Sequence, residues 1–166
     1  MAKIIFTPIG IIHSPFHRPE GTPIQPAAAA DVAGTVTVFP AYQEGLQDLE
    51  GFSHLFLIYH FHLSKNSTLK VTPFLDQTTR GVFATRAPSR PNPIGISVVR
   101  LDRIEGATLF IRDVDVIDGT PLLDLKPYVP AFDSRTDARI GWLAANLEKM
   151  PKVRDDGRFS APKDDS

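Results

Sequence analysis

The sequence predicts a mostly β protein, a small antiparallel barrel in a single domain. Its apolar stretches are short, alternating or continuous, and are bounded by Gly, Pro and Asn. The 166 residues, 42% of them hydrophobic, are enough for one buried core. Many short strands in one domain favour a closed or nearly closed barrel. Strands are expected at 9–13, 35–39, 54–62, 82–85, 94–101 and 108–117.

Turn and helix signals complete this prediction. Glu105-Gly106-Ala107 forms a short turn with a glycine able to take positive φ, so residues 94–117 are expected to form a hairpin. Residues 42–49 could form a short helix. A C-terminal helix is expected after Ser134 or Thr136, because the apolar residues that follow have helical spacing. These are Ile140, Leu143, Ala144 and Leu147, and Met150 and Pro151 end the helix.

The chain therefore divides into a domain at 1–150 and a tail at 151–166. The tail is charged, contains proline and is poor in apolar residues, so we expect it to be flexible. No apolar stretch is long enough to span a membrane, and the first residues lack the features of a signal peptide. We expect a soluble, cytoplasmic protein.

Composition excludes several classes of function. The absence of cysteine rules out disulfides, thiolate nucleophiles and cysteine-ligated zinc. The P-loop, the Gly-x-Ser-x-Gly elbow and the dinucleotide-binding glycine motif are all missing, which argues against ATPases, serine hydrolases and Rossmann enzymes. The net charge of −1 gives no global attraction to nucleic acid, so RNA contact would need a local basic patch.

The segment Arg86–Ser97 provides such a patch. Its three prolines restrict the backbone, so Arg86 and Arg90 project from a stiff loop that can hold an anionic ligand with little ordering cost. The interval Arg80–Arg103 contains five arginines against Asp102 alone. A proline-rich connector with solvated arginines is the alternative interpretation.

A second stiff polar segment, Asp118–Pro130, has a similar design. It combines a turn with prolines, two carboxylates, Lys126 and Tyr128. Two such loops in one small protein indicate a shared pocket. Residues 22–30 combine a rigid entry with an alanine run, as an ordinary loop leading into a helical turn also would.

Several motifs occur together in one order and resemble the TsaA-like, TrmO-type tRNA methyltransferases. The resemblance covers roughly residues 4–132, and the two long loops carry most of its specificity. The matching pieces are Gly10–Phe16, Gln25-Pro26, Leu49–Leu55, Phe61-His62, Gly81–Arg86, the Arg90–Gly95 loop and the Asp118–Pro121 loop.

This resemblance implies a β-barrel enzyme that uses S-adenosylmethionine to methylate N6 of threonylcarbamoyladenosine beside the tRNA anticodon. It also implies a homodimer and chemistry without a metal. The cofactor-binding positions that it implies are Pro26, Ala27, Ala28, His62, Leu63, Arg86, Ile96, Arg112, Asp113, Val114 and Asp115.

The expected reaction also needs groups that act on the acceptor. The acceptor nitrogen belongs to a urea and is a poor nucleophile, so a base should assist loss of its proton. Asp118, Asp124 and Tyr128 are the candidates for this base, although Asp118 could simply cap its own turn. Arg86 could pair with a carboxylate. The residues expected to contact the tRNA anticodon loop are Arg90, Asn92, Asp124, Lys126 and Tyr128.

Two other functions stay open at this point. The basic loop could belong to a non-catalytic RNA-binding barrel. Alternatively, His60 and His62 share one face of a strand, and with His54 they could support a metal-dependent enzyme, although no patterned carboxylate accompanies them.

Overall fold

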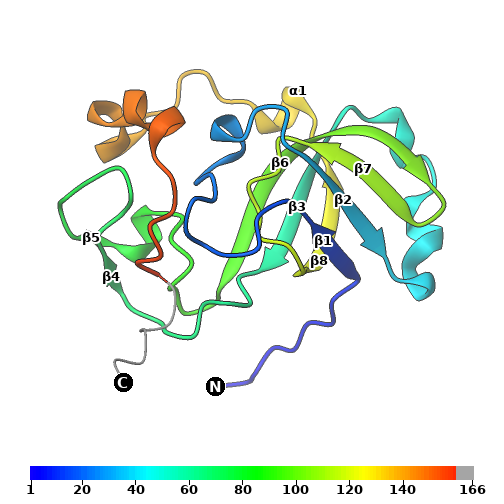
Figure 1. The fold of residues 1–166 in the computed structure, drawn as a ribbon, viewed down its shortest axis with the longest axis horizontal. Helices are drawn as coiled ribbons and strands as arrows, with labels where there is room; N and C mark the ends of the chain where they lie inside the picture. The colour runs from blue at the N-terminus through cyan, green and yellow to red at the C-terminus, as the bar shows by residue number, and fades with distance from the viewer. Residues whose placement is uncertain (160–166) are drawn as a thin grey trace.

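The structure is a computed structural model that describes residues 1–159. Six antiparallel strands form a closed barrel in the order β1-β2-β7-β6-β3-β8, and β4 and β5 form a separate two-stranded sheet (Figure 1). The barrel strands are β1 (Gly10–His13), β2 (Ala33–Val38), β3 (His54–His60), β6 (Ile94–Glu105), β7 (Thr108–Arg112) and β8 (Thr120–Pro127). The small sheet pairs β4 (Lys70–Val71) with β5 (Arg80–Gly81). The prediction of a mostly β, barrel-like domain is confirmed.

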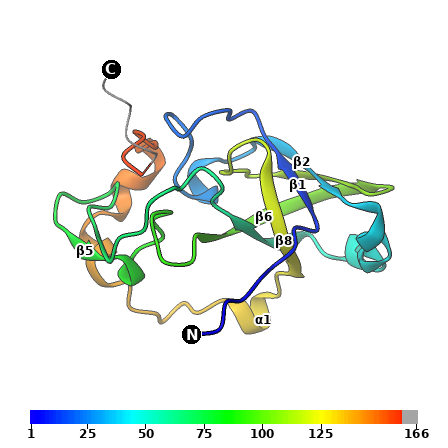
Figure 2. The ribbon, with the colours of Figure 1, turned by 90° about the horizontal axis from the view of Figure 1, so that it is seen from below.

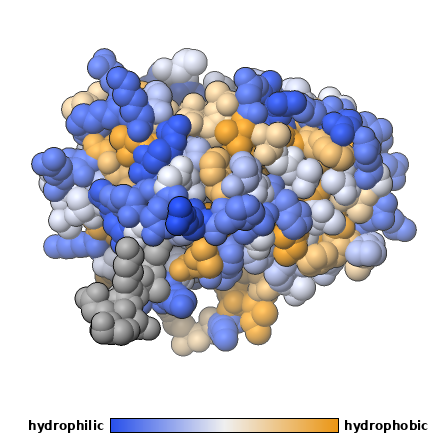
Figure 3. Space-filling model, in the orientation of Figure 1, coloured by the Kyte–Doolittle hydropathy of each residue, from blue (hydrophilic) through white to orange (hydrophobic). Residues whose placement is uncertain are grey.

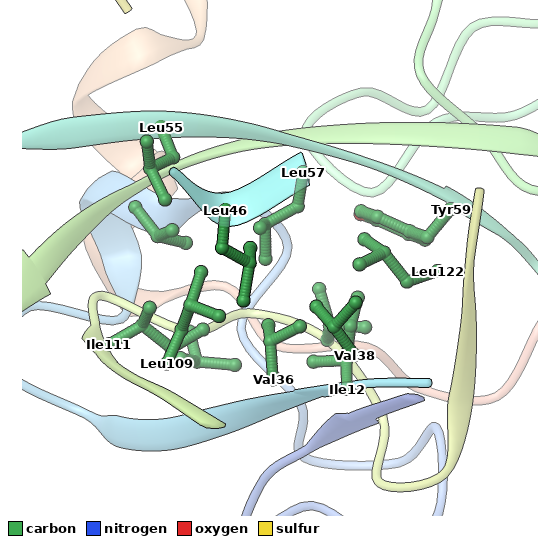
Figure 4. Packing of buried hydrophobic residues seen from close by; sticks show 13 residues of the cluster. Ile12, Val36, Val38, Leu46, Leu55, Leu57, Tyr59, Leu109, Ile111 and Leu122 are labelled. Atoms are coloured by element: carbon green, nitrogen blue, oxygen red, sulfur yellow. The ribbon is translucent and has the colours of Figure 1, made fainter. Parts of the chain in front are cut away.

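The barrel core follows the alternation of side chains along each strand. Leu55, Leu57 and Tyr59 of β3 are buried, and the residues between them are half-buried. Inside the barrel they meet buried side chains of the other strands, together with Leu46 from the segment between β2 and β3, as Figure 4 shows. The labelled partners are Ile12, Val36, Val38, Leu46, Leu109, Ile111 and Leu122. Tyr59 lies at one end of this core, and it also lines the cavity described below.

Strand pairing explains how distant segments come together. β3 pairs with β6 along its whole length and with β8 on its other side. β6 and β7 form the predicted hairpin through Gly106, which has φ +61. The second strand ends at Arg112 rather than at 117, because Asp113 turns the backbone with φ +66.

One strand prediction and one loop prediction were wrong. Residues 82–85 form the 3₁₀ helix η4 (Val82–Ala84), where the Thr85 hydroxyl donates to the Val82 carbonyl at 2.7 Å. The segment expected as a polar loop, Asp118–Pro130, is mainly strand β8. Its two prolines hide a strand alternation in which Thr120 and Leu122 are buried.

Helical structure is short throughout the described residues. The helix expected at 42–49 appears as η2 (Pro40–Leu46) and η3 (Leu49–Gly51), both 3₁₀ helices. The single C-terminal helix is replaced by η5 (Gly141–Ala145) and η6 (Leu147–Lys152), because Gly141 takes φ +57 and Pro151 removes a backbone donor. The remaining elements are η1 (Pro26–Ala28) and α1 (Pro130–Asp133).

The segment after η6 returns to the domain. Gly21 N donates to Asp155 O at 2.7 Å, and Asp155 N donates to Thr22 O at 2.9 Å. Asp155, in the segment expected to begin a flexible tail, therefore pairs with the loop before η1. Residues 160–166 of that predicted tail lie outside the described part of the chain.

Figures 1 and 2 show the barrel on one side of the molecule and the β4–β5 sheet with the C-terminal 3₁₀ helices on the other. The loops 19–25, 85–90 and 155–159 meet between these two parts. Among residues 1–159, no helix is both long and apolar enough to cross a membrane.

Candidate active site

A cavity of about 250 Å³ lies where the end of β3 meets the loops around Gln25 and Arg86. We call it the Tyr59 cavity. Tyr59, Asp115 and Thr120 come from the barrel end, and Arg86 comes from the proline-rich loop. Phe159 closes another side from the C-terminal segment. The cavity therefore combines an apolar wall with a few polar groups, as small-molecule sites do.

A hydrogen-bonded chain forms part of the cavity floor. The buried Ser97 hydroxyl donates to Asp115 Oδ1 at 2.6 Å. The Tyr59 hydroxyl lies 3.0 Å from Ser97 Oγ and, because the Ser97 proton is already used, Tyr59 is the donor to Ser97. Burial raises the pKa of Asp115 to about 7, although the Ser97 hydrogen bond and the charge of Arg86 act against it. Burial likewise raises the pKa of Tyr59. Asp115 therefore titrates near neutrality, and it is held by the Ser97 hydroxyl, which is itself hydrogen-bonded to Tyr59.

Gly95 leaves room for this arrangement. A Cβ at Gly95 would overlap the Tyr59 ring, and it would lie 2.8 Å from Phe61. The two rings meet edge to face, with 5.4 Å between their centroids. The glycine of the Arg-Pro-Asn-Pro-Ile-Gly motif is thus required by close ring packing beside the cavity.

The five arginines of the interval Arg80–Arg103 divide into two groups. Three of them pair with carboxylates: Arg80 with Asp76, Arg100 with Asp31 and Asp113, and Arg103 with Glu105. Within residues 1–159, Arg86 and Arg90 make no such pair. Arg86 Nη1 donates to Gln25 Oε1 at 2.8 Å, and Arg90 Nη1 donates to Thr85 O at 3.0 Å. Arg86 is exposed in the cavity wall and is available to an anion.

Three other residues that the sequence analysis predicted for the site, His62, Leu63 and Ile96, also line the Tyr59 cavity. His62 Nδ1 is 3.4 Å from Thr120 Oγ1. Burial lowers the pKa of His62, and the charge of the neighbouring His60 lowers it further, so the His62 imidazole is neutral at pH 7. Leu63 and Ile96 also line the cavity and are partly exposed.

Several predicted cofactor residues lie next to the cavity without lining it. Pro26, Ala27 and Ala28 form η1 directly after Gln25. Arg112 donates to Asp102 at 2.8 Å, and Asp113 accepts from Arg100 Nε at 2.8 Å. Val114 is buried in the core, so the cavity receives only Asp115 from the segment Arg112–Asp115.

Asp118 lies at a turn outside the cavity wall. Its carboxylate faces His13 Nδ1 at 3.2 Å and His17 Nδ1 at 3.5 Å, and it accepts from Ser14 N at 3.2 Å. Burial opposes ionisation, but these hydrogen bonds and the two histidines outweigh it and lower the pKa of Asp118. The carboxylate therefore caps the backbone after β1 at Ser14, and not its own turn as the alternative interpretation expected.

The remaining predicted substrate residues lie apart from the cavity within the chain. Asp124 and Lys126 form an exposed ion pair at 2.9 Å. Tyr128 packs against Phe56 and His54, at the opposite end of β3 from Tyr59. Asn92 is exposed in the proline-rich loop. Thr120 is the part of the second stiff segment that reaches the cavity.

The histidines of β3 do not assemble a metal centre in the described residues. No group of three or more His, Cys, Asp or Glu side chains comes close enough there to hold a metal ion. His54 Nδ1 instead lies 2.8 Å from the Ser53 hydroxyl.

A family model for the tRNA-methyltransferase O N-terminal domain matches residues 11–134. The chain belongs to this family. The TrmO resemblance of the sequence motifs is thereby confirmed. The match includes the six strands of the barrel from Ile11 onward and both stiff segments, and it ends before η5.

Relatives of this TrmO-type chain differ in length. A Pyrococcus abyssi protein described as a probable S-adenosyl-L-methionine-binding protein is 62% identical, over 94% of this chain and 85% of its own length. The tRNA (adenine(37)-N6)-methyltransferase of Mus musculus is 36% identical, but the match covers 80% of this chain and only 32% of the mouse protein. A crystal structure of TrmO from Pseudomonas aeruginosa has a TM-score of 0.70 and 41% identity, covering 84% of this chain and 61% of that one.

Several residues of the Tyr59 cavity and its floor were not identified from the sequence. Tyr59 and Ser97 look like ordinary strand residues, since one alternates with leucines and the other lies among aliphatic residues. Phe159 lies in a segment whose composition indicates a tail. Gln25 was part of a matched motif, and its contact with Arg86 could have been proposed from it.

Proposed function

We propose that this protein is an S-adenosylmethionine-dependent tRNA methyltransferase that acts on N6 of threonylcarbamoyladenosine next to the anticodon. The observation that carries the proposal is Arg86, an exposed arginine without a carboxylate partner in the described residues, in the wall of a cavity whose floor carries Asp115. The names of the P. abyssi and mouse relatives support the cofactor and the tRNA. A cytoplasmic location and a homodimeric state belong to the same proposal.

The residues of the Tyr59 cavity fit the chemical groups of this cofactor. The Arg86 fork can bind the carboxylate of an amino acid, and the Asp115 carboxylate can accept hydrogen bonds from ribose hydroxyls. Phe61, Leu63 and Ile96 offer apolar surface for the adenine ring. When bound, the cofactor supplies an electrophilic methyl group, which the acceptor attacks directly.

The protein contributes to this chemistry by positioning the methyl donor and the acceptor and by excluding water from the site. Ser97, held in turn by Tyr59, orients Asp115, while Gln25 orients Arg86. Asp118 stays a proposed base for the acceptor, although its lowered pKa makes it a weak one. Arg90, Asn92, Asp124, Lys126 and Tyr128 are proposed to contact the RNA.

The test uses anticodon stem-loops with and without the threonylcarbamoyl group, together with radiolabelled S-adenosylmethionine. Label should enter only the modified RNA and should be found on adenine N6 after digestion and mass analysis. Equal labelling of both RNAs would contradict the substrate. Cofactor binding without transfer to either RNA, measured by calorimetry, would support the binding module instead.

A further inference from the structure

A second cavity of about 490 Å³ adjoins the Tyr59 cavity. We call it the Trp142 cavity. The two cavities share a wall, so a side chain such as Arg86 contacts both spaces. The residues that line both are Ile24, Gln25, Phe74, Thr85, Arg86 and Phe159.

Four aromatic side chains line the Trp142 cavity. Trp142 and Phe83 face it in addition to the shared Phe74 and Phe159. Phe83 is 74% exposed, so most of its ring surface is free to contact a ligand. Figure 3 shows apolar side chains among hydrophilic ones over the corner of the molecule formed by η5 and η6. Exposed rings beside a cavity provide surfaces on which a flat ligand can stack.

The Trp142 ring is fixed before any ligand binds. Its indole N–H donates to Ala84 O at 2.8 Å, so its polar group is already satisfied. The Arg80 guanidinium lies 5.6 Å from the ring centroid and is itself held by Asp76 at 2.6 Å. A preorganised ring loses little side-chain entropy when a partner stacks on it.

The far wall comes from residues beyond the family match. The match ends at residue 134, whereas Trp142, Leu143, Leu147 and Met150 follow it. This C-terminal segment thus adds an aromatic and aliphatic wall next to the family's barrel.

We propose that the Trp142 cavity binds the purine base of the acceptor nucleotide, turned out of the RNA, while the Tyr59 cavity holds the methyl donor. This inference rests on the proposed function. Methyl transfer needs donor and acceptor in contact, which two cavities with a common wall allow. A base must leave its stack before an enzyme can reach it, and aromatic walls recognise such a base by stacking. An arginine in the shared wall suits the polar edge of a base or the threonyl carboxylate of the modified adenosine.

The test uses the fact that the chain has a single tryptophan. N6-threonylcarbamoyladenosine and adenosine would each be titrated into the protein with S-adenosylhomocysteine saturating the donor site. Both nucleosides should quench Trp142 fluorescence, whereas S-adenosylhomocysteine alone should change it little. Loss of nucleoside quenching at saturating S-adenosylhomocysteine would overturn the proposal, because the two ligands would then share one site.

Variants provide a second readout. Phe83→Ala should raise the KM for the modified stem-loop about tenfold and leave the Kd for S-adenosylmethionine unchanged. Phe132→Ala is the matched control, since Phe132 is 67% exposed and lines neither cavity. Equal KM values for the two variants would contradict the base-binding role. If the wild-type protein transfers no methyl to any RNA, the proposed function fails, and the nucleoside titration still decides the role of the cavity.

Discussion

At the scale of single residues, the site depends on which charges are already paired. Three of the five arginines between positions 80 and 103 are held by carboxylates and one braces its own loop, which leaves Arg86 for a ligand. A count of charges along the sequence does not distinguish these five arginines from one another. Proline stiffening did distinguish Arg86 and Arg90 from the others, because the three prolines between positions 88 and 93 restrict the loop that carries them.

Arg86→Ala should weaken S-adenosylmethionine binding by roughly tenfold or more, because a charged hydrogen bond of about 1.5–3 kcal/mol is lost. Arg86→Lys should recover only part of the affinity, since lysine lacks the planar fork. Calorimetric titration measures both. Arg103→Ala is the control, because Arg103 pairs with Glu105 and does not line the cavity. Equal affinities for the Arg86 and Arg103 variants would rule out the assigned contact.

Asp115 should make cofactor affinity depend on pH. Burial raises the pKa of Asp115 to about 7, and only the carboxylate accepts two ribose hydrogen bonds. Affinity should therefore rise as the pH increases through about 7. Asp115→Asn should bind more weakly and lose this dependence. Calorimetry over this pH range is the measurement, and an unchanged profile in the Asn variant would show that another group titrates.

At the scale of elements, the close contact between β3 and β6 at Gly95 is a test of packing. Gly95→Ala should destabilise the fold by about 1–3 kcal/mol, because the added methyl overlaps Tyr59 and Phe61. Gly45→Ala is the control, since nothing lies within 4 Å of a Cβ there. The midpoint of urea unfolding reports the difference. Similar midpoints for both variants would mean that the two rings move aside at little cost.

The elements also show how far the sequence could predict this molecule. Alternation correctly predicted the strands that carry the core and the β6–β7 hairpin, because their buried faces are continuous. It failed at β8, where prolines interrupt the pattern, and at η4, where an apolar run forms a 3₁₀ turn. The cavity floor could not be predicted, since Tyr59, Ser97 and Asp115 meet only through the pairing of β3 with β6 and the turn after β7.

At the scale of the whole molecule, two groups of carboxylates have opposite effects on stability. Burial raises the pKa of Asp115 to about 7 and that of Asp155 to about 6. The folded state keeps these protons when the unfolded chain has lost them, so stability decreases as the pH rises from about 4 to about 7. Hydrogen bonds from Arg80 lower the pKa of Asp76, which contributes stability that is lost as the pH falls below about 4.

The melting temperature should therefore be highest on the acid side of neutrality. Asp115→Asn should flatten the decline toward neutral pH and stabilise the protein at about pH 8 by on the order of 2–4 kcal/mol. Thermal unfolding followed by circular dichroism across this range is the measurement. A wild-type melting temperature that keeps rising through pH 7 would be inconsistent with a protonated Asp115 in the folded protein.

Barrel closure joins the two ends of the matched region. All four residues of β1 pair with β2 on one side, and Gly10, Ile11 and Ile12 pair with β8 on the other, where Gly10 lies opposite Leu122. During synthesis, β1 leaves the ribosome more than a hundred residues before its second partner. The barrel can close only after β8 emerges, so β1 and β8 should form among the last pairings, at the entropic cost of a long loop. Thr120, at the start of β8, lines the Tyr59 cavity, so ligand-binding competence should appear only at this closing step of folding.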